Sequence, residues 1–237
     1  GSHFYMKRFY ECAVAASIPK GGYTINLDGK PIKTPSKRTL IVPTRSLADV
    51  IATEWGKQGD TVQFRTLPLT KLANSAVDYV MTQRKSVICE LVACGQIDLL
   101  CYRSPDSEEL LARQEKSWQP LLDWAESYLG VALITTNGVV PIRQGNEQIA
   151  RLREVLSEQK PFFLSGLHSA TFATQSVVIA LALGKSHITP FEAWSVGMLD
   201  EIYQTELWGD DLEKSKRLAE LRFEIEAAGR FMEMSIG

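Results

Sequence analysis

The sequence lacks the short motifs that mark the common classes of enzyme. It contains neither G-x-G-x-x-G nor G-x-x-x-x-G-K-[ST], the glycine-rich loops that hold nucleotide phosphates. It also contains neither the G-x-S-x-G nucleophile elbow nor the H-E-x-x-H zinc motif. The sequence thus contains few catalytic signatures, and we predict no catalytic residue and no cofactor.

Cysteines are few, and their spacing does not suit a metal ion. The four are Cys12, Cys89, Cys94 and Cys101; none of them forms a C-x-x-C pair, and the three histidines are remote from any cysteine pair. We expect no metal site. We interpret the cysteines as buried free thiols of a protein in a reducing compartment.

An excess of charge of one sign is also missing. The formal net charge is -2, so no overall basic field attracts nucleic acid. Lys30, Lys33, Lys37 and Arg38 form a basic cluster, but no aromatic residues are interleaved with them. This pattern indicates a solvated strand edge that charge protects from aggregation, and we predict no nucleic-acid partner.

One long segment lacks charge, although it is not uniformly apolar. Residues 161–184 contain no charged side chain and are long enough to span a bilayer. Serine, threonine, glutamine and histidine interrupt the segment, so its continuous apolar part is only 177–183. We interpret it as a helix buried in a bundle and expect no stable membrane insertion.

The N-terminal part of the chain has the period of β-strands. Residues 23–35 alternate between apolar and polar and turn at Asp28-Gly29, a strong hairpin signal. Further short strands are predicted at 39–43 and 62–69. A helix lies between them, and either Thr44 or Ser46 can cap it.

After Pro68 the period becomes helical. We predict a small hairpin around Asn137-Gly138 and long helices over about 107–128, 145–158, 161–183, 190–208 and 210–233. Segregation of strands and helices along the chain favours an α+β fold. We expect a small N-terminal β-rich (α+β) domain over 4–80 and a larger C-terminal all-α helix bundle over 81–237.

The segment DEIYQTELWGDD, residues 200–211, carries five acids together with a tyrosine and a tryptophan. On a helical wheel, Asp200, Gln204 and Trp208 fall on the polar side, and Glu201 lies next to Trp208. Glu206 falls within the apolar arc. The opposite, packed side is predicted to contain Phe191, Trp194, Met198, Leu199, Ile202 and Tyr203.

Several functions for this segment can be compared. The spacing does not match a calcium loop, and the adjacent acids Asp200 and Glu201 diverge, which is poor geometry for a hydrolytic pair. A solvated acidic helix end and a protein-binding face remain open, since aromatic residues ringed by charge are typical of interfaces. An alternative is a small acid-dependent hydrolase that uses Glu206 and His168 in a deep pocket.

Seven motifs in order along the chain resemble the Atp12 family, the assembly chaperones of the F1 part of ATP synthase. They are RFYECA (8–13), LDGKPIKTP (27–35), ATEWGKQGDTV (52–62), LPLTKLANSAVD (67–78), DLLCYR (98–103), RQEKSWQPLLDWAE (113–126) and LDEIYQTELWG (199–209). The resemblance implies a chaperone that is not an enzyme, binds the free F1 α subunit and shields its β-facing interface without using ATP. It also implies an N-terminal α+β domain followed by an orthogonal helical bundle.

The resemblance also points to individual residues. Asp200, with Glu201 as the neighbouring possibility, falls at the functional acidic position of the family, and Gln204 and Trp208 complete the expected partner-binding face. Trp55, Asp28 and Gly29 fall in structural family motifs. We expect a monomer in which Asp200→Lys or Trp208→Ala abolishes α-subunit capture with little change in melting temperature. Whether Trp208 points outward or folds into the core stays open.

The start of the chain bears on where the protein acts. Gly1, Ser2 and His3 look like the scar of a cleaved tag, and no signal sequence follows them. The absence of a presequence resembles the bacterial branch of the family and predicts a cytoplasmic protein. A processed mitochondrial form in the matrix is the other possibility.

Overall fold

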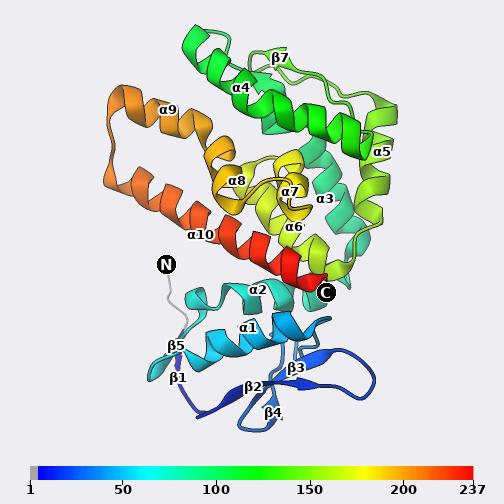
Figure 1. Ribbon diagram of the computed structural model, residues 1–237, viewed down its shortest axis with the longest axis vertical. Coiled ribbons are helices and arrows are strands. Elements are labelled where there is room, and N and C mark those ends of the chain that lie inside the picture. Colours follow the sequence, from blue (N-terminus) through cyan, green and yellow to red (C-terminus); the bar gives the residue numbers. More distant parts are fainter. Residues whose placement is uncertain (1–4, 237) are drawn as a thin grey trace. The chain divides into compact units, whose positions relative to one another are not determined.

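The computed structural model describes residues 5–236, so the segment Gly1–His3 lies outside the described residues, as does the first residue of the predicted N-terminal domain. The chain divides into two compact units (Figure 1). The first contains residues up to 84 together with 160–166 and 230–237; the second contains 85–159 and 167–229. The predicted division at residues 80 and 81 stays a prediction.

The first unit combines short strands with two helices. Its elements are β1 (Tyr5–Lys7), β2 (Ala13–Ser17), β3 (Tyr23–Leu27), β4 (Lys30–Pro31), α1 (Arg45–Gly56), β5 (Thr61–Gln63), the 3-10 turn η1 (Phe64–Thr66), α2 (Pro68–Ser75) and the π-helical turn η2 (Ala76–Val80). Strands β2, β3 and β4 form an antiparallel sheet in that order, and β1 pairs with β5. Helix α1 packs against β2 and β3.

The second unit is mainly helical. Its elements, some of which continue into the first unit, are α3 (Arg84–Gln96), η3 (Leu99–Cys101), β6 (Tyr102–Arg103), α4 (Glu108–Trp124), the π-helical turn η4 (Ala125–Leu129), β7 (Thr136–Asn137), α5 (Asn146–Ser157), α6 (Pro161–Thr174), α7 (Val177–Gly184), α8 (Pro190–Gly197), α9 (Leu199–Trp208) and α10 (Leu212–Ser235). Helix α4 packs against α7 and α9. The α+β class is confirmed.

The predicted hairpin at Asp28-Gly29 is confirmed. Leu27 pairs with Lys30, and both turn residues have positive φ, 50° at Asp28 and 83° at Gly29. Such angles match the turn that a two-residue hairpin favours. The Asp28 carboxylate also accepts hydrogen bonds from the N–H groups of Cys12 and Glu11, at 2.9 and 3.0 Å. These bonds hold the pKa of Asp28 below its usual value and tie the turn to the start of β2.

Two predicted strands of the first unit are wrong in extent. Residues 39–43 make only isolated bridges, in which Thr39 faces Lys33 and Val42 faces Tyr23. The predicted strand at 62–69 ends at Gln63, because a 3-10 turn follows and Pro68 begins α2. Proline suits the first helical position, since its missing N–H leaves no intrahelical hydrogen bond unmade there.

Two helices that the sequence predicts as continuous are broken. The helix expected at 161–183 stops at Thr174, where Gln175 has a φ of 60° and the Ser176 hydroxyl accepts a hydrogen bond from the N–H of Ile179. The helix expected at 190–208 is interrupted at Met198. Helix α7 is fully buried, and no helix within residues 5–236 is both long and apolar enough to cross a bilayer.

The predicted hairpin at Asn137-Gly138 and the predicted burial of all four thiols are also wrong. Strand β7 pairs in parallel with the distant β6, and Gly138 donates its N–H to the carbonyl of Arg103. Cys12 and Cys89 are exposed, whereas Cys101 is buried. Burial, assisted by nearby Asp98, raises the pKa of the Cys101 thiol to about 12.

Trp55 anchors the core of the first unit. Its side chain is 7% exposed on the buried face of α1 that also contains Leu47 and Ile51. The indole Nε1 donates to the hydroxyl of Thr70 at 3.0 Å, and the Trp55 carbonyl accepts from the hydroxyl of Tyr10 at 2.6 Å. The ring therefore has both apolar contacts and a satisfied polar atom.

Asp98 holds the start of α7 in the second unit. Its side chain is 0% exposed and accepts hydrogen bonds from the N–H groups of Leu100 and Val178, at 3.0 and 3.1 Å. Burial raises the pKa of Asp98 from 3.8 to about 6, and the hydrogen bonds oppose that rise. A carboxylate at a helix N-terminus also interacts favourably with the helix dipole.

Substitution of Trp55 with alanine should strongly destabilise the protein. Loss of a buried tryptophan leaves a cavity, and we expect a decrease of about 3–5 kcal/mol in the free energy of unfolding. Chemical denaturation monitored by circular dichroism measures it. Trp208→Ala, which removes an exposed ring, should change the same quantity by less than about 0.5 kcal/mol; similar losses in both variants would contradict this view of the core.

Asp98 should give the protein a pH-dependent stability. Because its folded pKa is raised, the folded state binds this proton more tightly than the unfolded chain. The stabilisation is fully present below pH 3.8 and is lost as pH rises through about 6. The total change is on the order of 3 kcal/mol. From pH 4 to 7, the free energy of unfolding of the wild type should fall relative to that of Asp98→Asn; parallel curves would remove Asp98 as the cause.

Candidate functional site

Helix α9 is joined to α4 by a partly buried hydrogen bond. Gln114 of α4 is 1% exposed, and its Nε2 donates to Oδ1 of Asp200 at 2.9 Å. Its Oε1 accepts from the N–H of Ser104 at 2.7 Å. Asp200 is itself partly buried, which raises its pKa, whereas the Gln114 bond lowers the pKa and Glu201 raises it. The carboxylate of Asp200, the predicted functional acid, is thus held in place.

A second set of contacts joins the same two helices. The Tyr203 hydroxyl lies 3.2 Å from that of Ser107, which caps the N-terminus of α4 by accepting from the N–H of Leu110. The Arg113 guanidinium lies 5.2 Å from the centre of the Tyr203 ring and forms an ion pair with Glu206 at 2.7 Å. These contacts hold the middle of α9 against α4.

Helix α10 holds α9 from another side. Arg217 of α10 forms a 2.6 Å ion pair with Glu201, and the Trp194 indole of α8 donates to the carbonyl of Leu218 at 2.9 Å. Figure 1 shows that α10 runs back in roughly the opposite direction to α9 after the connection that joins them. The Glu201 carboxylate therefore already has an arginine partner within the protein.

The end of α9 projects apolar side chains into solvent. Trp208 is 81% exposed, Leu207 is 51% exposed and Leu212, at the start of α10, is 86% exposed. We call these three residues the α9 tip. The acids Glu206, Asp210 and Asp211 that accompany them are exposed as well. An apolar patch with an acidic surround is what a protein-binding surface requires.

The structure corrects the predicted wheel at three positions. Asp200 does not share an open face with Trp208, because it points to Gln114. Glu206 does not lie in an apolar arc, since it is exposed and paired with Arg113. Phe191, expected to be packed, is 52% exposed. The interruption at Met198 changes the rotational phase between α8 and α9, so a single wheel cannot describe both.

The remaining predicted residues have separate surroundings. Gln204 is exposed on α9. His168, on α6, lies 2.8 Å from a Glu90 carboxylate oxygen and packs its ring on Phe172. Glu206 has Arg113 as its partner, so the structure does not bring the two groups of the alternative hydrolase together.

Sequence reasoning missed the residues of α4 that hold α9. Gln114 lies 86 positions before Asp200, and Ser107 lies 96 positions before Tyr203. No periodicity connects such distant positions. The motif RQEKSWQPLLDWAE does include Arg113 and Gln114, but only the tertiary contacts show what they do.

The chain matches the family model of the ATP12 chaperone protein over residues 7–126. It belongs to the ATP12 chaperone family. A solved structure of Atp12 from Paracoccus denitrificans has 33% sequence identity and a TM-score of 0.91, and the match covers 97% of this chain and 98% of that one. Atu1473, a putative chaperone from Agrobacterium tumefaciens, has 38% identity and a TM-score of 0.93, with 97% of this chain and 86% of that chain covered.

A curated relative supports the same assignment. The mitochondrial protein atp12 of Schizosaccharomyces pombe is 28% identical over 215 residues, which is 86% of this chain and 74% of that protein. The predictions of an ATP12-family fold and of a chaperone for F1-ATPase assembly are confirmed. The α9 segment lies beyond the residues that the family model matches but within the span of the structural matches.

Changes at Asp200 should separate charge from hydrogen bonding. Asp200→Asn retains an acceptor for Gln114, so the melting temperature should be close to that of the wild type. Asp200→Lys removes the acceptor and leaves a buried amide donor unpaired, which we expect to cost about 1–3 kcal/mol. Thermal and chemical unfolding measure both. Because Asp200 is half-buried, we now expect Asp200→Lys to lower the stability, whereas the sequence predicted little change in melting temperature. Equal stability of Asp200→Asn and Asp200→Lys would contradict this expectation.

Proposed function

We propose that this ATP12-family chaperone binds the free F1 α subunit and shields the face that later meets the β subunit, without using ATP. The observation that carries the proposal is the 81% exposed Trp208 at the α9 tip, on a helix fixed by α4 and α10. A tryptophan with this exposure can bury a large area on binding. Rigid aromatic anchors of this kind often dominate interface energies.

The physical need for such a chaperone follows from the client. A subunit that normally contacts a partner exposes apolar interface when it is alone, and such a surface promotes aggregation. The α9 tip offers apolar contact, and the acids around it offer charge complementarity to a basic rim. A cover of this kind must later be displaced, which a modest interface with an exposed electrostatic rim allows.

The residues of the proposed face have different roles. Trp208 is the proposed anchor, and Gln204 is free to make polar contacts on the same helix. Asp200 and Glu201 hold α9 through Gln114 and Arg217, so their effect on binding is proposed to be mainly positional. In this assignment each residue of the face either contacts the client or positions α9, and none of them has a catalytic role.

The proposal extends to the state and place of the protein. We propose a monomer with no enzymatic activity that acts in the bacterial cytoplasm, where F1 assembles. The two bacterial structural relatives share 33% and 38% identity with this chain, compared with 28% for the mitochondrial relative from Schizosaccharomyces pombe. A processed form in the mitochondrial matrix is the alternative location.

Binding should be tested with the α subunit co-produced with this protein in the absence of β. Trp208→Ala should reduce capture of soluble α subunit by about 30-fold or more, which is the usual effect of losing an aromatic anchor. The readout is the amount of α subunit that co-purifies. Tyr128→Ala is the matched control, because Tyr128 is an aromatic residue, 67% exposed, outside α9.

Each outcome of the capture experiment has a different meaning for the proposed binding surface. Loss of capture with Trp208→Ala but not with Tyr128→Ala supports the α9 tip as the anchor. Equal capture by wild type and Trp208→Ala would move the binding surface elsewhere. Capture of β instead of α would overturn the assignment of the client. Melting curves of both variants should overlay the wild-type curve.

A further inference from the structure

The first unit contains a large groove that the proposed α-subunit face does not use. Its volume is about 1310 Å³, and every residue that lines it belongs to the segment between Met6 and Asp78. Typical sites for small molecules are about 300–1,000 Å³. The groove is therefore larger than a small ligand requires. The chemistry of the side chains that line it indicates which kind of ligand it fits.

One wall of the groove is a row of aromatic rings in edge-to-face contact. The ring centres of Phe9 and Tyr10 are 5.3 Å apart, those of Tyr10 and Trp55 are 5.9 Å apart, and those of Trp55 and Phe64 are 6.5 Å apart. Phe9 is 65% exposed and Phe64 is 39% exposed, whereas the two central rings are buried. The row therefore offers exposed apolar surface at both ends, while its two central rings are packed in the core.

The wall is fixed from behind by the half-buried carboxylate of Glu54. Glu54 accepts hydrogen bonds from the N–H of Leu69 at 2.8 Å, and from the N–H and hydroxyl of Thr70 at 2.9 and 2.8 Å. The same Thr70 hydroxyl accepts from the Trp55 indole. Burial raises the pKa of Glu54, and the bonds from Leu69 and Thr70 lower it. The wall is thus formed before a ligand arrives, which lowers the entropic cost of binding.

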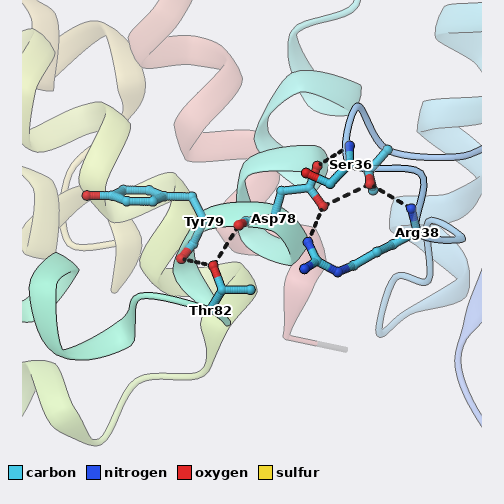
Figure 2. A network of polar contacts seen from close by, with 6 residues as sticks. Ser36, Arg38, Asp78, Tyr79 and Thr82 are labelled. Carbon is cyan, nitrogen blue, oxygen red and sulfur yellow. Dashed lines mark hydrogen bonds and ion pairs between the residues drawn. The ribbon is translucent and has the colours of Figure 1, made fainter.

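The acids of the groove are already satisfied by the protein. Asp28 accepts two backbone N–H groups. Figure 2 shows Asp78 turned toward the loop that carries Ser36 and Arg38. Asp78 accepts from the N–H of Ser36 at 3.0 Å and from the Arg38 guanidinium at 2.9 Å, and the Thr34 hydroxyl donates to it at 2.8 Å. Both carboxylates thus already accept hydrogen bonds from the protein itself.

The lysines of the groove are not satisfied in this way. Lys30, Lys33 and Lys71 line the groove and are exposed, and none of them forms an ion pair with any residue within 5–236. The groove therefore combines an apolar aromatic wall with a rim of free positive charge. Its complement is a ligand that is apolar and negatively charged.

We propose that this groove binds an extended peptide segment in which aromatic or aliphatic side chains alternate with carboxylates. Apolar side chains would contact Phe9 and Phe64, while the carboxylates would face Lys30, Lys33 and Lys71. The buried rings of Tyr10 and Trp55 expose almost no face for base stacking, which argues against single-stranded nucleic acid. The proposal does not depend on the α9 tip or on the identity of its client.

The test uses synthetic peptides and the full chain. The ligand is a fluorescein-labelled peptide of about twelve residues that alternates phenylalanine or leucine with glutamate and reaches roughly 40 Å when extended. Binding is measured by fluorescence anisotropy. We expect it to bind at least about tenfold more tightly than the same peptide with lysine in place of glutamate, and to weaken as salt is raised.

Variants of the protein locate the binding. Lys33→Glu should weaken binding of the acidic peptide by about three- to tenfold, whereas Lys20→Glu, an exposed lysine of the same unit outside the groove, should not. Phe9→Ala should weaken it by about tenfold. Val14→Ala is its control, since Val14 is 55% exposed and does not line the groove. Because Phe9 and Lys33 are exposed, we expect all four variants to retain the wild-type melting temperature.

Several results would overturn the proposal. Equal affinity for the glutamate and lysine peptides would remove the electrostatic basis, and equal effects of Lys33→Glu and Lys20→Glu would place the peptide elsewhere. Tighter binding of oleate or of an oligothymidine would reject a peptide as the occupant. None of these results depends on capture of the F1 α subunit, so failure here is distinguishable from failure at the α9 tip.

Discussion

The hydrogen bond between Gln114 and Asp200 is the constraint on which the candidate client face depends. Gln114 is almost completely buried, so both its amide oxygen and its amide nitrogen need partners within the protein. Ser104 supplies one and Asp200 the other. Because α9 is separated from α8 by the interruption at Met198, this bond and the contacts of Tyr203 and Arg113 determine where α9 lies. The exposed tip follows from that anchoring.

Asp200, which the sequence predicts as the functional acid, therefore has a positioning role in the structure. A carboxylate that is partly buried and hydrogen-bonded to a buried amide holds a helix in place, and charge reversal there disturbs the position of everything beyond it. The large exposed ring of Trp208 is the group suited to contact. The predicted importance of Asp200 and the proposed contact at Trp208 are compatible, because Asp200 helps to position the helix that carries Trp208.

Each unit carries an apolar surface beside charge, and the sign differs. The α9 tip has acids around Trp208, whereas the groove of the first unit has free lysines around Phe9 and Phe64. In both places the groups beneath the surface are fixed by partly buried hydrogen bonds, from Gln114 in one case and to Glu54 in the other. Exposed charge contributes little affinity but favours fast association and release. Under the proposed function, a chaperone that releases its client without using ATP needs both properties.

Local patterns in the sequence determined much of the secondary structure, and tertiary contacts decided the site. The Asp28-Gly29 turn and the helix at 210–233 depend on neighbouring residues, so the sequence predicts them; it left Thr44 and Ser46 open as the cap of α1, and the structure selects Thr44. The motifs in family order likewise identified the chaperone family. The break at Met198, the parallel pairing of β6 with β7 and the bond between Gln114 and Asp200 depend on residues far apart in the chain, which periodicity cannot connect. The exposure of Trp208 was also undetermined by sequence, because one residue at a helix end can turn either way until packing fixes the helix.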